Sequence, residues 1–179
     1  MAEFLWIFWS FSLLGWVLER LFAAVTWSPR RRRRCLLLLP LCPVYGLGMA
    51  AVLALPPSLR SGWPLYLWGG LTATSVEYIY HWWGETFLGV SFWDYTGVFG
   101  NFRGRVCLPF SLAWGLLLFP AVYLVTPPVV ALADRVPIGV TWWLLLAFTA
   151  DAVCSLRFLA VTHDLEALRA VIWPVSADR

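Results

Sequence analysis

The chain has 179 residues, of which 61% are hydrophobic and 13% are charged, with a formal net charge of +3. Soluble domains carry about 45–50% apolar and about 25% charged residues, so this composition excludes a soluble domain, a disordered chain and a surface nucleic-acid binder. All 13 basic residues are arginine, which excludes the phosphate-binding lysine of a P-loop ATPase. We therefore expect an all-α, polytopic integral membrane protein that binds no nucleic acid.

Five apolar stretches are candidate membrane spans, because a bilayer core of about 30 Å requires about 20 mostly apolar residues per helix. They cover residues 4–25, 35–55, 64–84, 106–125 and 138–159. Pro40 and Pro43 should break the second helix, since proline lacks the backbone N–H that a helix uses. Residues 85–105 are too aromatic for a solvated loop and too rich in glycine for a span, so we expect an interfacial loop. The chain 1–179 is predicted to form a single transmembrane domain.

Arginine placement predicts the orientation, because cytoplasmic loops of membrane proteins are enriched in basic residues. The arginines on one side of a five-helix bundle are Arg30–Arg34, Arg103, Arg105, Arg157, Arg169 and Arg179. The other side has only Arg60 and Arg135. We therefore predict a multi-pass protein of the cell membrane, with its N-terminus outside and its C-terminus and the 85–105 loop on the cytoplasmic side.

Ionisable residues within the predicted spans mark candidate sites, because each costs about 2.5–3.5 kcal/mol to insert. They are Glu19, Arg20, Glu77, His81, Asp151 and Arg157. In the predicted topology all of them fall in the cytoplasmic half of their helices. The unusual residues of the even helices, among them Tyr45 and Ser111, fall in the same half. We expect one polar pocket that opens toward the cytoplasm.

Glu77, His81 and Glu85 are spaced at i, i+4 and i+8, so they form a stripe on one helix face. Such a stripe could ligate a divalent metal, relay protons or bind a cationic group. The alternative is a set of ion pairs between helices, such as Glu77 with Arg20, that fixes helix register. Both interpretations stay open at this point.

The 85–105 loop contributes further candidates, since Asp94 lies between two aromatic residues and Asn101 precedes a glycine by three positions. Each could contact a ligand or cap a turn. The full predicted pocket consists of Glu19, Arg20, Tyr45, Glu77, His81, Glu85, Asp94, Asn101, Arg103 and Ser111. The four cysteines lack C-x-x-C spacing, so we expect small buried side chains rather than a zinc site or a redox pair.

Several ordered motifs resemble one known family. They are Leu14-Gly15-Trp16 with Glu19, Pro40-x-x-Pro43-Val44-Tyr45-Gly46-x-Gly48, Glu77-Tyr78, Trp93-Asp94-Tyr95, Asn101-x-x-Gly104-x-Val106-Cys107-Leu108 and Ser111-x-x-Trp114-Gly115. This set, within residues 10–120, resembles the CmpB-type putative ABC-transporter (type IV) permease family. The resemblance implies a small multi-helix membrane protein that acts as a transporter component. Family members usually have glycines where this chain has Cys35 and Leu39.

Three functions are open on this basis. The favoured one is a transport protein or permease component, whose ATPase would be a separate chain because this one has no ATPase motif. The second is a membrane-embedded enzyme for a lipid or lipid-linked substrate at the inner leaflet. Its acid/base candidates are Glu77, His81, Glu85 and Asp94, and Arg20, Arg103 and Arg105 could hold phosphate. No nucleophile motif supports it, so no catalytic residue is assigned. The third is a non-catalytic assembly subunit. Expected partners are the bilayer, further copies of the chain and the ATPase. No cofactor is firmly implied, and a divalent cation is the one candidate.

Overall fold

The computed structural model describes residues 2–26 and 35–170, and this part of the chain is helical with no β-strand. The α-helices are α1 (Ala2–Thr26), α2 (Pro43–Leu53), α3 (Gly62–Pro64), α4 (Gly70–Trp83), α5 (Leu108–Pro120), α6 (Thr126–Ala133), α7 (Ile138–Thr162) and α8 (Leu165–Ala170). A 3-10 turn covers Pro57–Leu59. The π-helical turns η3 (Leu65–Gly69) and η5 (Ala121–Val125) join neighbouring α-helices, and η4 (Gly84–Leu88) extends the C-terminal end of α4. The predicted all-α membrane bundle is confirmed.

Three helices in the described residues are long and apolar enough to cross a bilayer, namely Ala2–Val25, Leu108–Ala133 and Ile138–Thr162. They correspond to the first, fourth and fifth predicted spans. The second predicted span is helical only over the 11 residues of α2, which at about 1.5 Å per residue is too short to cross. The third predicted span lies within the helical run 62–88. Polar residues in this run make it less apolar than the three long helices.

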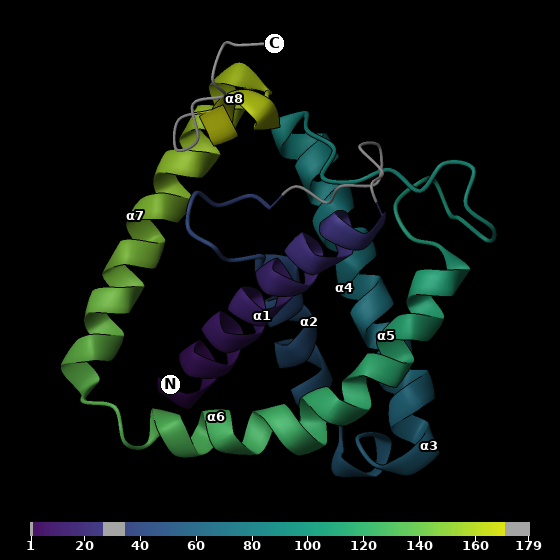
Figure 1. Cartoon of the computed structure of the whole chain (residues 1–179), viewed down its shortest axis with the longest axis vertical. Helices are drawn as coiled ribbons and strands as arrows, with labels where there is room; N and C mark the ends of the chain where they lie inside the picture. Colours follow the sequence, from purple (N-terminus) through teal and green to yellow (C-terminus); the bar gives the residue numbers. More distant parts are fainter. Residues whose placement is uncertain (1, 27–34, 171–179) are drawn as a thin grey trace.

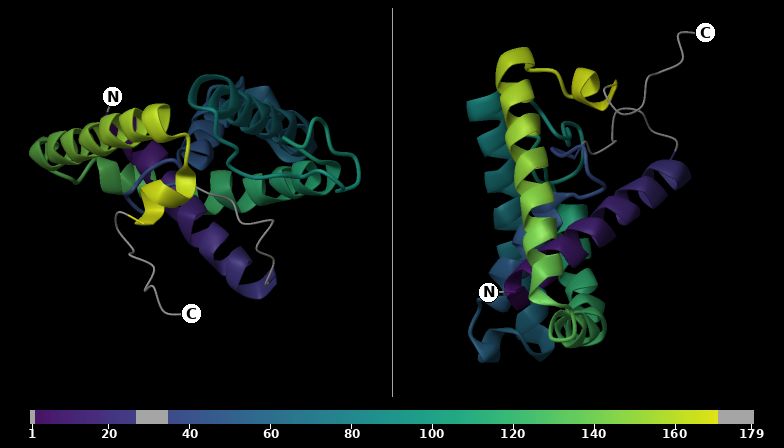
Figure 2. Two further views of the ribbon diagram at one scale, coloured as in Figure 1. Left: turned by 90° about the horizontal axis from the view of Figure 1, so that it is seen from above. Right: turned by 90° about the vertical axis from the view of Figure 1, so that its left-hand side faces the viewer.

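The helices alternate in direction, with α1, α4 and α7 running upward in Figure 1 and α2 and α5 running downward. The segment after α5 was predicted to be a loop, but it is helical. There α6 continues the helix across the lower end of the molecule (Figures 1 and 2). The interfacial loop also begins later than predicted, since helical structure continues to Leu88. Gly89 then ends the helix in the left-handed region, at φ 66°.

The predicted break in the second helix is present, since residues 35–42 are irregular and Pro43 is the first helical residue. Two cysteines that we expected to be unbonded, Cys35 and Cys42, form a disulfide that closes this segment. The expectation failed because sequence spacing does not reveal which side chains an irregular segment brings together. Of the other two, Cys107 is buried as expected and Cys154 is exposed.

Asp151 on α7 fastens this irregular segment to the bundle. Its carboxylate accepts hydrogen bonds from the backbone N–H groups of Leu38 and Leu39, at 3.1 and 2.8 Å, and from Ser155 Oγ at 2.9 Å. Irregular backbone is tolerated at membrane depth only where protein or water satisfies it. Asp151 therefore supplies the acceptors that this segment lacks within itself.

Close contacts at glycine position the helices around the centre. A side chain at Gly70 of α4 would lie 3.2 Å from the Cα atom of Gly115 on α5, so these two helices pack backbone to backbone. A side chain at Gly15 of α1 would overlap the ring of Tyr45 on α2. Both contacts require glycine, and they bring Tyr45 and Trp114 toward the polar residues of α1 and α4.

Candidate functional site

Glu77 on α4 is the most deeply buried carboxylate among the described residues, at 1% exposure. Tyr95 Oη, from the loop after η4, donates a hydrogen bond to Glu77 Oε1 at 3.2 Å. Trp114 Nε1, from α5, donates to Glu77 Oε2 at 2.7 Å. Three separate parts of the chain therefore converge on this one carboxylate.

A second carboxylate lies on the other side of the same aromatic residues. Glu19 on α1 is 9% exposed and accepts a hydrogen bond from Tyr45 Oη on α2. The Tyr45 ring meets the Trp114 ring edge to face, with centroids 5.1 Å apart. We call Glu19, Tyr45, Glu77, Tyr95 and Trp114 together the carboxylate pocket.

Two adjoining cavities open onto this pocket. The first, of about 210 Å³, is lined by Glu19, Tyr45, Tyr95 and Trp114 together with other apolar side chains. The second, of about 340 Å³, is lined by Glu77 and by mostly aliphatic residues of α1, α2 and α5. Tyr45 and Trp114 line both cavities, so the two cavities adjoin each other, with Glu19 at the first and Glu77 at the second.

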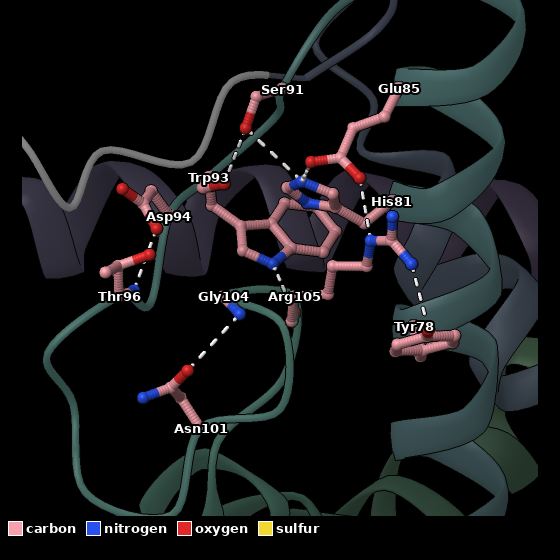
Figure 3. Close-up of polar contacts among 10 residues, drawn as sticks. All are labelled: Tyr78, His81, Glu85, Ser91, Trp93, Asp94, Thr96, Asn101, Gly104 and Arg105. Atoms are coloured by element: carbon pink, nitrogen blue, oxygen red, sulfur yellow. Dashed lines mark hydrogen bonds and ion pairs between the residues drawn. The ribbon is translucent and has the colours of Figure 1, made fainter.

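A different polar network lies two turns further along α4, as Figure 3 shows. Glu85 accepts hydrogen bonds from Arg105 Nε at 2.7 Å and pairs with His81 Nε2 at 3.1 Å. Arg105 also donates to Tyr78 Oη at 2.8 Å, and Ser91 Oγ lies 3.3 Å from His81 Nε2. We call His81, Glu85, Ser91 and Arg105 the loop clamp, because they join the loop after η4 to α4.

The loop clamp does not have the geometry of a nucleophilic triad. A triad needs the acid on one imidazole nitrogen and the hydroxyl on the other. Here Glu85 and Ser91 both contact Nε2 of His81, and Ser91 Oγ donates its hydrogen to the carbonyl of Trp93 at 2.9 Å. His81 Nδ1 is buried and has no hydrogen-bond partner among the residues that the structure describes. Ser91 is therefore not activated by this histidine.

The remaining loop candidates form turns (Figure 3). Asp94 Oδ1 accepts the backbone N–H of Thr96 at 2.8 Å. The Thr96 side chain first, and this backbone N–H second, lower the pKa of the exposed Asp94 carboxyl. Asn101 donates to the carbonyl of Val98 at 3.0 Å and accepts the N–H of Gly104 at 3.3 Å. Both side chains stabilise local turns, which was the alternative to ligand contact.

Three other predicted residues lie away from the two cavities. The exposed Arg20 side chain places its guanidinium 5.3 Å from the ring of Trp16. Glu77, which the alternative interpretation paired with Arg20, accepts hydrogen bonds from Tyr95 and Trp114. Exposed Arg103 lies over the ring of its neighbour Phe102. Ser111 donates to the Cys107 carbonyl of its own helix.

The predicted stripe of Glu77, His81 and Glu85 does not form one site. Glu77 belongs to the carboxylate pocket, whereas His81 and Glu85 belong to the loop clamp. Within the described ranges, no group of three or more His, Cys, Asp or Glu side chains is arranged to hold a metal ion. The stripe therefore supplies two separate sets of contacts and brings together no three-residue metal site.

Four residues with clear roles were absent from the predicted pocket. Tyr95 and Trp114 hold Glu77, Arg105 holds Glu85, and Asp151 holds the segment 35–42. Asp151 was singled out as an ionisable residue within a predicted span, which requires a partner, but its backbone partners could not be identified from the sequence. The two aromatic donors were harder to identify, because the chain has 13 tryptophans and 6 tyrosines.

The comparison with known protein families gives one match. A family model described as putative ABC-transporter type IV, of CmpB type, matches residues 6–156. It includes all the elements of the carboxylate pocket and the loop clamp, and it continues into α7. No curated protein matches the chain, and no solved structure matches it.

Proposed function

The chain belongs to the putative ABC-transporter type IV family, and from this premise we propose that it is the membrane-embedded permease component of a transport system. It is a membrane protein with apolar helices long enough to span a bilayer. In this proposal the carboxylate pocket holds the transported solute, with Glu19 and Glu77 providing its charge and Tyr45, Tyr95 and Trp114 its walls.

The presence of a buried carboxylate at each of two adjoining cavities carries the proposal. Glu19 and Glu77 come from different helices, and each lines one of two adjoining cavities. Carboxylates at membrane depth are expensive, and they generally mark substrate or ion pathways. A set of charges that served packing alone would not need a cavity beside it.

The pocket is proposed to open toward the cytoplasm, with the N-terminus outside and the C-terminus inside. Arginine placement supports this orientation, because basic residues are concentrated in the connections at one end of the bundle. Residues Arg30–Arg34 lie outside the described part of the chain, so this argument uses their position in the sequence alone. The loop clamp residue Arg105 would then lie at the cytoplasmic face.

Energy for transport would come from a separate ATPase chain. This chain has no lysine and therefore no P-loop of its own. The loop after η4 is the proposed contact for that ATPase. The loop clamp holds it in one conformation on α4, so a displacement of the loop would be transmitted to the helix that carries Glu77.

The proposal is tested by comparing ATP-dependent solute accumulation in inside-out membrane vesicles with and without the chain, using untargeted mass spectrometry. We expect at least one solute whose accumulation requires both ATP and the wild-type chain. Glu77→Gln should abolish it while the protein stays folded, and Glu3→Gln, at an exposed carboxylate in the first turn of α1, should not. The proposal is wrong if no solute depends on the chain.

A further inference from the structure

We propose that the second cavity binds the acyl chain of a phospholipid from the surrounding bilayer. We call this cavity the aliphatic crevice, and its lining includes Leu14, Val17, Gly48, Met49, Leu117 and Ala121. The inference goes beyond the proposed function, because it assigns a bound lipid to the chain whatever solute is carried. Three features support it: a buried glycine that faces open space, an apolar lining, and a side that is open to the bilayer.

Gly48 on α2 shows that the crevice is real space and not a fault of close packing. It is buried, yet a Cβ atom added to it would meet no atom of the described residues within 4 Å. Gly46, two positions earlier, is also buried, but a Cβ atom there would overlap the Phe8 carbonyl of α1. Helix packing therefore explains the glycine at 46 and not the glycine at 48. Because protein interiors are close-packed, the open space beside Gly48 indicates room for another molecule.

The crevice is suited to hydrocarbon rather than to water. Its volume is about 340 Å³, and aliphatic side chains make up most of its lining. A buried water needs two or more polar partners, and an empty cavity forfeits the dispersion contacts of its walls. The Glu77 carboxylate at this crevice accepts hydrogen bonds from Tyr95 and Trp114. A hydrocarbon chain leaves those contacts in place, since it needs neither charge nor hydrogen bonds.

One side of the crevice faces the bilayer. Leu14 and Val17 on α1 and Leu117 on α5 line it while being 45%, 39% and 43% exposed. Both helices belong to segments that are long and apolar enough to cross a membrane, so these exposed side chains face hydrocarbon. Figure 2 shows α1 leaning away from the other helices toward its C-terminal end. An acyl chain can therefore enter sideways without passing through water.

A chain in the crevice differs from ordinary lipid around the protein. It is contacted by α1, α2 and α5 together, whereas a lipid beside the exposed face of α7 touches one helix, since only 11% of that span is buried. Affinity grows with each methylene group that is enclosed. The crevice should therefore retain a phospholipid chain that the face of α7 exchanges freely.

Photolabelling of the full chain in phosphatidylcholine vesicles tests the inference. The vesicles contain a small fraction of phosphatidylcholine that carries a diazirine in the middle of one acyl chain, and mass spectrometry maps the labelled residues. Met49 is the decisive position, because it is only 3% exposed and lines the crevice. We expect it to be labelled roughly tenfold more than exposed Leu146 and Val153 of α7, a ratio that burial of about two further methylene groups would produce. Labelling of Met49 at or below the level of these two residues would overturn the inference.

A substitution that fills the crevice locates the lipid. Gly48→Leu should lower the labelling of Met49 roughly tenfold and leave that of Leu146 unchanged. Gly139→Leu is the matched control, because this glycine of α7 also faces open space but is exposed and distant in the fold from the crevice lining. Unchanged labelling of Met49 in a folded Gly48→Leu protein would overturn the inference. If Gly48→Leu fails to fold, Gly48→Ala, which adds one methyl group to the same space, should still lower the labelling, and an unchanged map would again contradict the assignment.

The source of the chain is tested with a diazirine-bearing palmitic acid in the same vesicles. Labelling of Met49 by the fatty acid and not by phosphatidylcholine would overturn phospholipid as the occupant. These experiments use neither ATP nor a transported solute, so their outcome is separate from that of the accumulation experiment. A labelled crevice in a chain that moves no solute would refute the transport role and leave the lipid site, whereas transport with an unlabelled crevice would refute the lipid site alone.

Discussion

Glu77 and Glu85 lie on the same helical run, eight residues apart, and they have opposite surroundings. Glu77 is 1% exposed and receives hydrogen bonds from Tyr95 and Trp114. The Glu85 side chain is 36% exposed and forms an ion pair with Arg105. The spacing that suggested a single site therefore connects two different regions, the carboxylate pocket and the loop clamp.

The difference follows from what packs against each end of the helical run. Around Glu77, α2 and α5 lie alongside α4, so its carboxylate points into the bundle. Around Glu85 the neighbour is the loop after η4, and the helix has changed to a π-helical turn over Gly84–Leu88. Charge pairs at such a partly exposed edge contribute little to stability, whereas a buried carboxylate with donors on both oxygens contributes much more.

The contrast between the carboxylate pocket and the loop clamp predicts that Glu77→Ala destabilises the protein most. The substitution removes the acceptor of Tyr95 and Trp114, and each buried donor left unsatisfied costs about 1–3 kcal/mol. We expect a loss of about 3 kcal/mol in the free energy of unfolding, measured by denaturant unfolding in mixed micelles. A loss no larger than that of Glu85→Ala would contradict the distinction between the two regions.

Asp151→Ala should have the next largest effect, and it sharpens the comparison by adding a carboxylate with a purely structural role. The backbone N–H groups of Leu38 and Leu39 would lose their acceptor, at a cost of about 2 kcal/mol. Asp134→Ala, at an exposed position after α6, is the matched control. Thermal unfolding in detergent measures both variants, and solute accumulation supported by the folded Asp151→Ala protein should be unchanged.

Glu85→Gln should cost about 1 kcal/mol, because it breaks a partly exposed ion pair while Arg105 keeps its hydrogen bond to Tyr78. The loop after η4 should become more susceptible to limited proteolysis, since the loop clamp holds it on α4. Solute accumulation in the vesicles should persist. Should Glu85→Gln abolish accumulation as strongly as Glu77→Gln, the loop clamp would be part of the solute site.

How much of the fold and of the candidate site could be predicted from the sequence depends on the kind of feature. The helical membrane class and the break before Pro43 follow from composition and from the chemistry of proline. The grouping of Glu19 with Tyr45 and Glu77 is consistent with the depth argument, since these residues occupy corresponding levels of alternating helices. Such an argument cannot identify partners, because it gives the height of a residue and not its direction around the helix axis.

The incorrect expectations have the same origin. Adjacent residues on a helix point about 100° apart, so the buried position of Glu19 left Arg20 at the surface. The disulfide between Cys35 and Cys42 depends on the path of an irregular segment, and α6 depends on a turn that continues a helix through Pro127 and Pro128 at its N-terminal end. None of these features leaves a periodic pattern in the sequence.

The smallest expected effect belongs to Asp94, on the exposed loop that the clamp holds. The hydrogen bond from Thr96 holds the pKa of this carboxyl below its ordinary value. A lowered folded-state pKa means that the charged form stabilises the turn above the unfolded-state pKa, and that this stability is lost as the pH falls through the folded-state pKa. The loop should therefore loosen only in acid, below about pH 4.

Asp94→Asn, which removes the titrating group, should flatten the pH dependence of loop cleavage in pH-jump proteolysis, and Asp134→Asn should not. Loosening in the wild-type chain near neutral pH would instead assign the transition to another group.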